Sequence, residues 1–146
     1  MSSLFSSIDI SASGMSAERQ RAEVLVQNLA NADTTRTADG GPYRRKDVVF
    51  QSSEVGSSFS TMLGSQMEEG GTGVEVAQVV TDNGEPDMRY MPGHPDANKD
   101  GFVAFPKVNP AEDMVDLLGA SRSYQANVAA VSAIKDMIQR SIDLFR

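Results

Sequence analysis

The segment from Asn109 to the C-terminus constrains the fold more than any other part of the chain, because its pattern predicts one long amphipathic helix. Asn109 is a favourable N-cap residue, Pro110 suits the first helical position, and Glu112 completes a capping-box pattern. No proline follows Pro110 and no glycine follows Gly119, so the helix can continue to the chain end. It would then be roughly 50 Å long, more than a domain of this size needs. Apolar residues recur at steps of three and four along it, interrupted only by Ser121 and Lys135: Met114, Leu117, Tyr124, Val128, Val131, Ile138, Ile142 and Phe145.

A second amphipathic helix is predicted at the N-terminus. Its apolar seam repeats at seven-residue intervals, at Ile8, Met15, Ala22 and Leu29. Gly14 and the serines before it weaken the first turns, so we expect the most regular part to run from residue 11 to residue 32.

Two interpretations of these helices remain open from their patterns alone. An intramolecular α-hairpin is the commoner outcome for two amphipathic helices in one chain. Both segments lie at the termini, however, and both carry heptad-like seams, so they can pair with each other and still present apolar surface to neighbouring copies. Because long helices without tertiary support are marginally stable in water, we expect the termini to be loosely ordered until partners bind.

The middle of the chain has a different character, with all six prolines lying between residues 42 and 110. Short β-like runs occur at residues 43–51, 74–81, 87–91 and 102–105, and Asn83-Gly84 is a hairpin-type turn between the second and third of them. The Ser/Gly-rich stretch near residues 52–73 predicts a flexible loop.

These patterns predict an α+β fold. Long N- and C-terminal α-helices form a coiled-coil-like pair, and a small, partly β domain lies between them. The expected divisions are a helical assembly segment at residues 1–32, a middle domain at residues 33–108 and a second helical assembly segment at residues 109–146.

Composition excludes several classes of protein. With 13 basic and 20 acidic residues the net charge is -7, which argues against nucleic acid as a partner. No cysteine is present, so disulfides and thiolate metal sites are excluded. No stretch approaches the roughly 20 apolar residues of a membrane span, and no cleavable signal peptide is recognisable at the N-terminus.

No pattern of catalytic, cofactor-binding or metal-ligating residues stands out. Residues 96–101 match the first half of a calcium-binding EF-hand loop, but Lys107 occupies the position where that loop needs a bidentate glutamate. A polar turn leading into a strand at Phe102 is the better interpretation. The single histidine, His94, has no serine or cysteine placed to work with it, and residues 70–73 lack the lysine of a phosphate-binding loop. We therefore predict that the chain is not an enzyme and binds no cofactor.

A short basic cluster follows a Gly-Gly-Pro turn, at Arg44, Arg45 and Lys46. It is too small for a nucleic-acid site. A solvated strand start and a polar contact with acidic surface on an adjacent subunit are equally good interpretations.

Several motifs resemble one family, the axial proteins of the bacterial flagellum. Asn-Leu-Ala-Asn-Ala at residues 28–32 resembles its N-terminal signature, and Ser-Tyr-Gln-Ala-Asn at residues 123–127 resembles its C-terminal counterpart. Residues 40–46 and 92–97 are similar to those of the proximal rod members of the family, as are the short motifs at residues 101–103 and 108–110. The resemblance extends from Ile8 to the C-terminus; residues 52–73 match nothing in the family pattern, and residues 105–107 depart from it.

The resemblance implies a structural subunit of the proximal rod of the flagellar basal body, part of the drive shaft that transmits torque from motor to hook. Implied partners are further copies of the chain, other rod proteins, the rod-base adaptor and the type III export apparatus. The implied location is the rod in the periplasmic space, reached without a cleavable signal peptide. The helices would pack in the inner part of the tube, with subunit-packing residues Ile8, Met15, Ala22, Asn28, Leu29, Asn31, Met114, Leu117, Tyr124, Asn127, Val128, Val131, Ile138, Ile142 and Phe145.

A different class of protein remains as the alternative. A secreted ligand-binding or adhesion module with helical ends would recognise its ligand through the middle domain. Such a module would stay a folded monomer, whereas a rod subunit would self-associate.

Overall fold

The computed structural model describes residues 2–54 and 71–144 and has the expected α+β architecture. The two long helices are at the ends of the sequence, and the segment between them forms two small antiparallel sheets. In chain order the elements are α1 (Ser2–Ala30), β1 (Lys46–Glu54), β2 (Thr72–Thr81), β3 (Asp87–Tyr90), β4 (Phe102–Phe105) and α3 (Pro110–Asp143).

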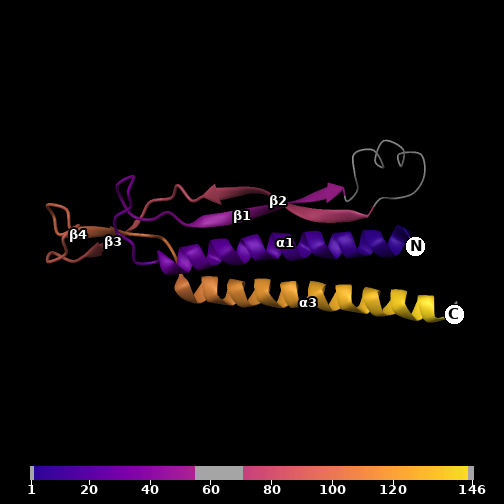
Figure 1. Cartoon of the computed structure of the whole chain (residues 1–146). Coiled ribbons are helices and arrows are strands. Elements are labelled where there is room, and N and C mark those ends of the chain that lie inside the picture. Colours follow the sequence, from indigo (N-terminus) through magenta and orange to yellow (C-terminus); the bar gives the residue numbers. More distant parts are fainter. Residues whose placement is uncertain (1, 55–70, 145–146) are drawn as a thin grey trace.

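Helix α1 is the central layer of an elongated molecule (Figure 1). The β1–β2 sheet packs on one side of α1, and α3 packs antiparallel on the other side, so that both chain ends lie at the same end of the molecule. The β3–β4 sheet lies at the opposite end, beyond the start of α3. The predicted coiled-coil-like pair of terminal helices is therefore present within one chain.

Helix α1 is helical from Ser2 to Ala30, so it includes the first turns, which were expected to be less regular than residues 11–32. Packing against both the sheet and α3 compensates for the weak helix propensity of its first turns. Gly14 contributes to that packing, because a Cβ atom at this position would lie 2.9 Å from Nδ2 of Asn127 on α3. Ser13 links α1 to the sheet by accepting a hydrogen bond from the backbone N–H of Val74, at 3.1 Å. The residues that weaken an isolated helix here allow close contact with its neighbours.

The sheets differ from expectation in extent and pairing. Strand β1 runs to Glu54 and β2 begins at Thr72, so both ends of the predicted 52–73 loop belong to strands; residues 55–70 lie outside the described part of the chain. The predicted hairpin at Asn83-Gly84 is wrong. Strand β2 pairs with β1, and β3 pairs with β4, so this turn connects two sheets instead of two paired strands. A turn motif specifies a local reversal but not which strands pair across it.

Helix α3 confirms the predicted start. The side chain of Asn109 accepts a hydrogen bond from the backbone N–H of Ala111, at 3.2 Å, and Pro110 is the first helical residue. Glu112 lies in the first turn, where a negative charge is favourable, without a side-chain hydrogen bond to Asn109. The helix continues for 34 residues to Asp143. Neither helix of the described residues is apolar enough over a sufficient length to cross a membrane.

Candidate functional site at the helix junction and along α3

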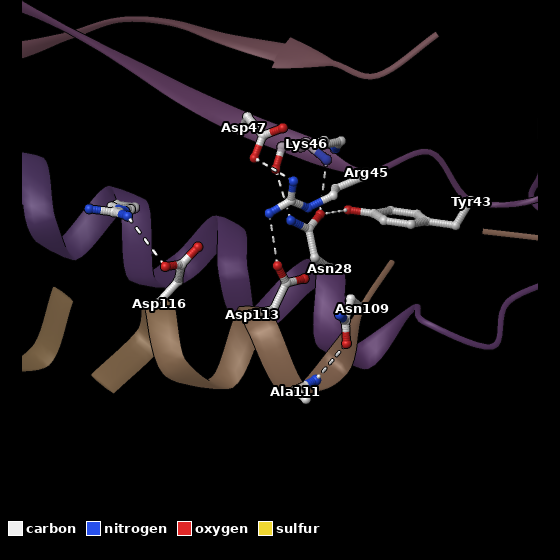
Figure 2. A network of polar contacts seen from close by, with 10 residues as sticks. Asn28, Tyr43, Arg45, Lys46, Asp47, Asn109, Ala111, Asp113 and Asp116 are labelled. Atoms are coloured by element: carbon white, nitrogen blue, oxygen red, sulfur yellow. Dashed lines mark hydrogen bonds and ion pairs between the residues drawn. The ribbon is translucent and has the colours of Figure 1, made fainter. Parts of the chain in front are cut away.

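Asn28 is the centre of a polar junction between α1 and β1 (Figure 2). Its side chain is fully buried and binds the backbone of Lys46 twice: Nδ2 donates to the carbonyl at 2.8 Å, and Oδ1 accepts from the N–H at 3.0 Å. The hydroxyl of Tyr43 also donates to Oδ1 of Asn28, at 2.9 Å. One side chain thus satisfies the backbone polar groups at the start of β1 and fixes that strand to α1.

The loop between α1 and β1 turns back so that Tyr43 and Lys46 reach Asn28. Its reversal uses Gly40 and Gly41, whose φ angles of 81° and 88° lie in the left-handed region that favours glycine. The backbone N–H of Tyr43 then donates to the carbonyl of Thr34, at 3.0 Å. The Gly-Gly-Pro-Tyr motif therefore has a conformational role in building the junction.

Arg45 and Asp113 form an ion pair that attaches α3 to the same junction. Nη2 of Arg45 lies 3.0 Å from Oδ1 of Asp113, whose side chain is 1% exposed, and Nη1 lies 3.4 Å from Oδ1 of Asp47. Figure 2 shows the guanidinium between these two carboxylates, directly above the start of α3. Nε of Arg45 and Oδ2 of Asp113 are buried without a hydrogen-bond partner among the described residues. Arg45 therefore neutralises the buried charge of Asp113, but one polar atom of each side chain lacks a hydrogen bond.

The electrostatics of the junction shift two pKa values. Burial alone would lower the pKa of Arg45, but its hydrogen bond to Asp113 and the charges of Asp47, Asp113 and Glu112 raise it above its ordinary value. The pKa of Tyr43 is raised, first by burial and then by the negative charge of Asp113. At neutral pH, Arg45 is therefore positively charged and the hydroxyl of Tyr43 is protonated.

We predict that Tyr43 contributes a pH-dependent part of the stability. Because its pKa is raised in the folded state, this contribution is complete below the ordinary tyrosine pKa of about 10 and is lost as pH rises through the folded-state pKa. Tyr43→Phe should lower the free energy of unfolding by about 1 kcal/mol at pH 8 through loss of the hydrogen bond to Asn28. Urea unfolding should show that difference shrinking at alkaline pH, and a pH-independent difference would contradict the prediction.

The predicted basic cluster has partners within the chain. Nη1 of Arg44 donates to Oδ1 of Asn83 at 3.0 Å, Arg45 pairs with two carboxylates, and Lys46 contributes its backbone to the bond with Asn28. Polar contacts of this cluster with another subunit remain a prediction.

The segment that resembles half of a calcium-binding loop forms a polar turn, as expected. Oδ1 of Asn98 accepts from the backbone N–H groups of Asp100 and Phe102, and Oδ2 of Asp96 accepts from the hydroxyl of Thr35. His94 accepts from the backbone N–H of Asp96 through Nδ1. Among residues 2–54 and 71–144, no three histidine or acidic side chains gather as metal ligands.

The structure places the predicted packing residues of α1 partly inside the molecule. Ile8, Met15, Ala22 and Leu29 are half-buried, and so is Asn31, whose side chain donates to the carbonyl of Gln27. The most buried residues on this helix are instead Ser11, Ala17, Val24, Leu25 and Asn28. A central helix with neighbours on two sides buries residues beyond a single seam.

On α3 the buried face is offset by one residue from the start of the predicted series. Asp113, Ala120 and Ile134 are buried and lie seven and fourteen residues apart, whereas Leu117, Asn127, Val131 and Ile138 are half-buried. The remaining predicted residues are exposed: Met114, Tyr124, Val128 and Ile142. Phe145 lies outside the described residues.

The sequence reasoning missed Asp113 and the partner of Tyr43. Asp113 starts a seven-residue series that continues through Ala120, Asn127 and Ile134. This series is the signal that could have identified the intramolecular face of α3. The larger apolar residues of the series that starts one position later, at Met114, give a stronger pattern and indicate a different packing face instead.

Comparison with known proteins gives consistent matches at both helices and over the whole chain. Residues 8–36 match the family described as flagella basal body rod protein, and residues 99–144 match the flagellar basal body rod FlgEFG protein C-terminal family. The chain is 43% identical to flagellar basal-body rod protein FlgC of Bacillus subtilis (strain 168), covering 96% of this chain and 97% of that protein. It is 37% identical to FlgC of Borreliella burgdorferi, covering 98% of both, and 38% identical to FlgC of Escherichia coli O157:H7, covering 97% of both.

The two family matches cover most of the paired terminal helices, including Asn28, and they define the class, a rod protein of the flagellar basal body. Similarity over nearly the full length is more specific, and the chain belongs to the FlgC family. It is a structural subunit of the proximal rod. The alternative of a secreted ligand-binding or adhesion module has no support from these comparisons.

Proposed function

We propose that the subunit joins its neighbours in the rod through the outer face of α3, and that the Asn28–Arg45–Asp113 junction keeps its own layers aligned under torque. The outer face is the exposed side of α3 that points away from α1, and it includes Met114, Val115 and Leu118. The observation that carries the proposal is the amount of large apolar side chain left uncovered on this face. Val115 is 67% exposed, Leu118 59% and Met114 51%.

The charge pattern of α3 supports the same proposal. Between Arg122 and Lys135 the helix contains no charged residue over twelve positions, although most of these positions are exposed. A helix face that remained in water would normally carry charged side chains. An uncharged, exposed stretch of about three turns is instead typical of a surface that becomes covered.

The free energy expected from burying this face favours a large assembly over a stable dimer. Fully burying a Val, Leu or Met side chain contributes about 1.5–3 kcal/mol, and these side chains are already partly covered. Association costs about 4–15 kcal/mol in lost freedom, so one such contact gives weak binding. Repeated contacts in an assembly add together, which would keep the subunit monomeric before incorporation and stable afterwards.

The junction supports transmission of torque because it connects all three layers. Asn28 fixes β1 to α1, and Arg45 fixes the start of β1 to the first turn of α3. A force applied to the sheet would therefore reach both helices through short polar contacts in addition to side-chain packing.

Further aspects of the proposal follow from the resemblance to rod proteins. Residues 1–32 and 109–146 would act as assembly segments around the middle domain at residues 33–108, and the seam residues of both helices would contribute to subunit packing. Neighbours would be further copies, other rod proteins and the rod-base adaptor in the periplasmic space. The chain would reach that space through the type III export apparatus, without a cleavable signal peptide, and would have no catalytic activity.

Leu118→Glu tests the proposal. It places a charge on the outer face of α3 at a position that is already 59% exposed, so the isolated chain should retain its thermal stability within roughly 3 °C, equivalent to about 1 kcal/mol. Rod assembly and swimming should nevertheless be lost, because the charge would be buried against a neighbour.

Gln78→Glu is the matched control, since it adds one negative charge at an exposed position of β2. Soft-agar motility and electron microscopy of isolated basal bodies give the readout. Normal swimming of the Leu118→Glu strain would overturn the proposed role of this face.

A further inference from the structure

A groove runs along α1 between the β1–β2 sheet and α3. Two cavities lie along it, of about 290 and 380 Å³, and Phe50 lines both of them. The α1 residues on its floor include positions 10, 14, 17, 21 and 24, whose spacing of three and four residues is that of a coiled-coil seam. Ser123 and Asn127 of α3 form one wall of the larger cavity, and Thr72, Gly73 and Val74 of the sheet form the other, so the groove opens to the outside between these two elements.

The groove contains a carboxylate oxygen without a partner. Glu18 lines the larger cavity, and its Oε2 atom is buried with no hydrogen-bond partner in the described part of the chain. Leaving a buried acceptor unsatisfied costs about 1–3 kcal/mol, and more when it is charged. Further along the groove, Oδ1 of Asp116 lies 3.9 Å from Nη2 of Arg21, which is a long distance for an ion pair, and both side chains are half-exposed. The groove would therefore favour an occupant that brings a positively charged donor.

The outer face of α3 presents a ridge with the complementary chemistry. The ridge consists of Arg122, Ala126, Ala129, Ala133 and Arg140, which recur at helical spacing and are all exposed. Neither Arg122 nor Arg140 forms an ion pair within residues 2–54 and 71–144. The alanines permit a close approach of helices, and the arginines supply charged donors at both ends of the ridge.

We propose that the groove of one copy binds the α3 ridge of a second copy, with Arg122 of the second copy donating to Oε2 of Glu18. The inference rests on the proposed function, and it adds where the outer face of α3 docks. Groove and ridge are different surfaces, so the contact is heterologous: each copy that offers a ridge still has an empty groove. Such contacts generate rings or open helices, as a tubular rod requires.

Cross-linking between single-cysteine variants tests the contact, because the chain has no cysteine of its own. Glu18→Cys and an epitope-tagged Arg122→Cys would be co-expressed, and basal bodies would be treated with a short bis-maleimide. Arg19→Cys replaces Glu18→Cys in the control, since Arg19 is the neighbouring α1 residue, its side chain is 66% exposed, and it lines neither cavity. Only a dimer of one tagged and one untagged chain is scored, which excludes links within a chain.

Neighbours held in an assembly present their thiols at an effective concentration in the millimolar range, so we expect at least about tenfold more heterodimer from the 18–122 pair than from the 19–122 pair. Equal yields, or no heterodimer, would overturn the inference. A cross-link from Glu18→Cys only to a protein of different mass would also overturn it, by assigning the groove to another rod component.

A second pair guards against a folding defect at Glu18. Thr72→Cys is exposed on the sheet wall of the groove, and Ala129→Cys lies at the centre of the ridge, so this pair should give the same result. The Leu118→Glu test separates the two proposals. Loss of motility there without an 18–122 or 72–129 cross-link would leave the outer face as an interface and reject the groove as its docking site. Normal motility without either cross-link would reject both.

Discussion

Replacing Arg45 with alanine is expected to lower the free energy of unfolding by about 3 kcal/mol, because it leaves the carboxylate of Asp113 buried without its positive partner. Loss of one partner of a buried ion pair typically costs about 3–5 kcal/mol. The lower end applies because the Arg45 side chain is 24% exposed, and water can partly replace it. The free energy of unfolding of a protein is typically about 5–15 kcal/mol, so the loss expected for Arg45→Ala is a large fraction of it.

Urea denaturation of the purified chain measures the effect. Arg44→Ala is the matched control, since Arg44 is exposed and its side chain bonds to Asn83 alone within the described ranges; it should change stability by less than about 0.5 kcal/mol. A loss below about 1 kcal/mol for Arg45→Ala would show that the ion pair does not stabilise the junction.

A double variant separates charge from packing. Asp113→Leu with Arg45→Met removes both charges together, along with the two polar atoms that lack partners, Nε of Arg45 and Oδ2 of Asp113. Since apolar replacement of a buried ion pair is often neutral or stabilising, this variant should recover most of the stability lost in Arg45→Ala. If motility were lost while stability recovered, the pair would have a role in alignment under load in addition to folding.

Asn28→Ala should produce a loss of similar size, about 3 kcal/mol. The substitution removes three hydrogen bonds and leaves the N–H and carbonyl of Lys46 and the hydroxyl of Tyr43 without their partner. Each unsatisfied buried group costs about 1–3 kcal/mol, although relaxation and water entry reduce the sum. For a chain of this length the melting temperature should fall by roughly 10 °C.

Asn31→Ala is the control within the same sequence motif. Asn31 bonds locally to Gln27 and Thr34 and is half-buried, so its loss should cost about 1 kcal/mol or less. Thermal unfolding followed by circular dichroism compares the two variants directly. Equal melting temperatures for both would contradict the central role assigned to Asn28.

The two sequence motifs that resemble the rod family acquire a physical basis from these contacts. In the first, Asn28 joins α1 to β1, and Asn31 bonds locally as the helix ends. In the second, Asn127 lies against Gly14 on the facing helix, with its own side chain donating to the carbonyl of Ser123. Both motifs therefore mark positions where elements of the same chain meet, apart from any role in contacts with other subunits.

The sequence by itself determined the class of protein and the limits of helix α3. The N-cap at Asn109, the proline at the first helical position and the absence of later breakers are local signals, and they predicted the start and extent of α3 correctly. The motifs near Asn28 and Tyr124 indicated the family before any contact was known. Such information is contained in short windows, where spacing and propensity suffice.

Only the tertiary structure decided which faces and which partners are used. A pattern with a period between three and four residues leaves an offset of one residue unresolved, so the buried series through Asp113 and Ala120 was indistinguishable from the apolar series through Met114. Strand pairing, the contact of α1 with Asn127 at Gly14, and the bond from Asn28 to Lys46 all join residues distant in sequence. Their energies depend on packing between elements, which no local spacing specifies.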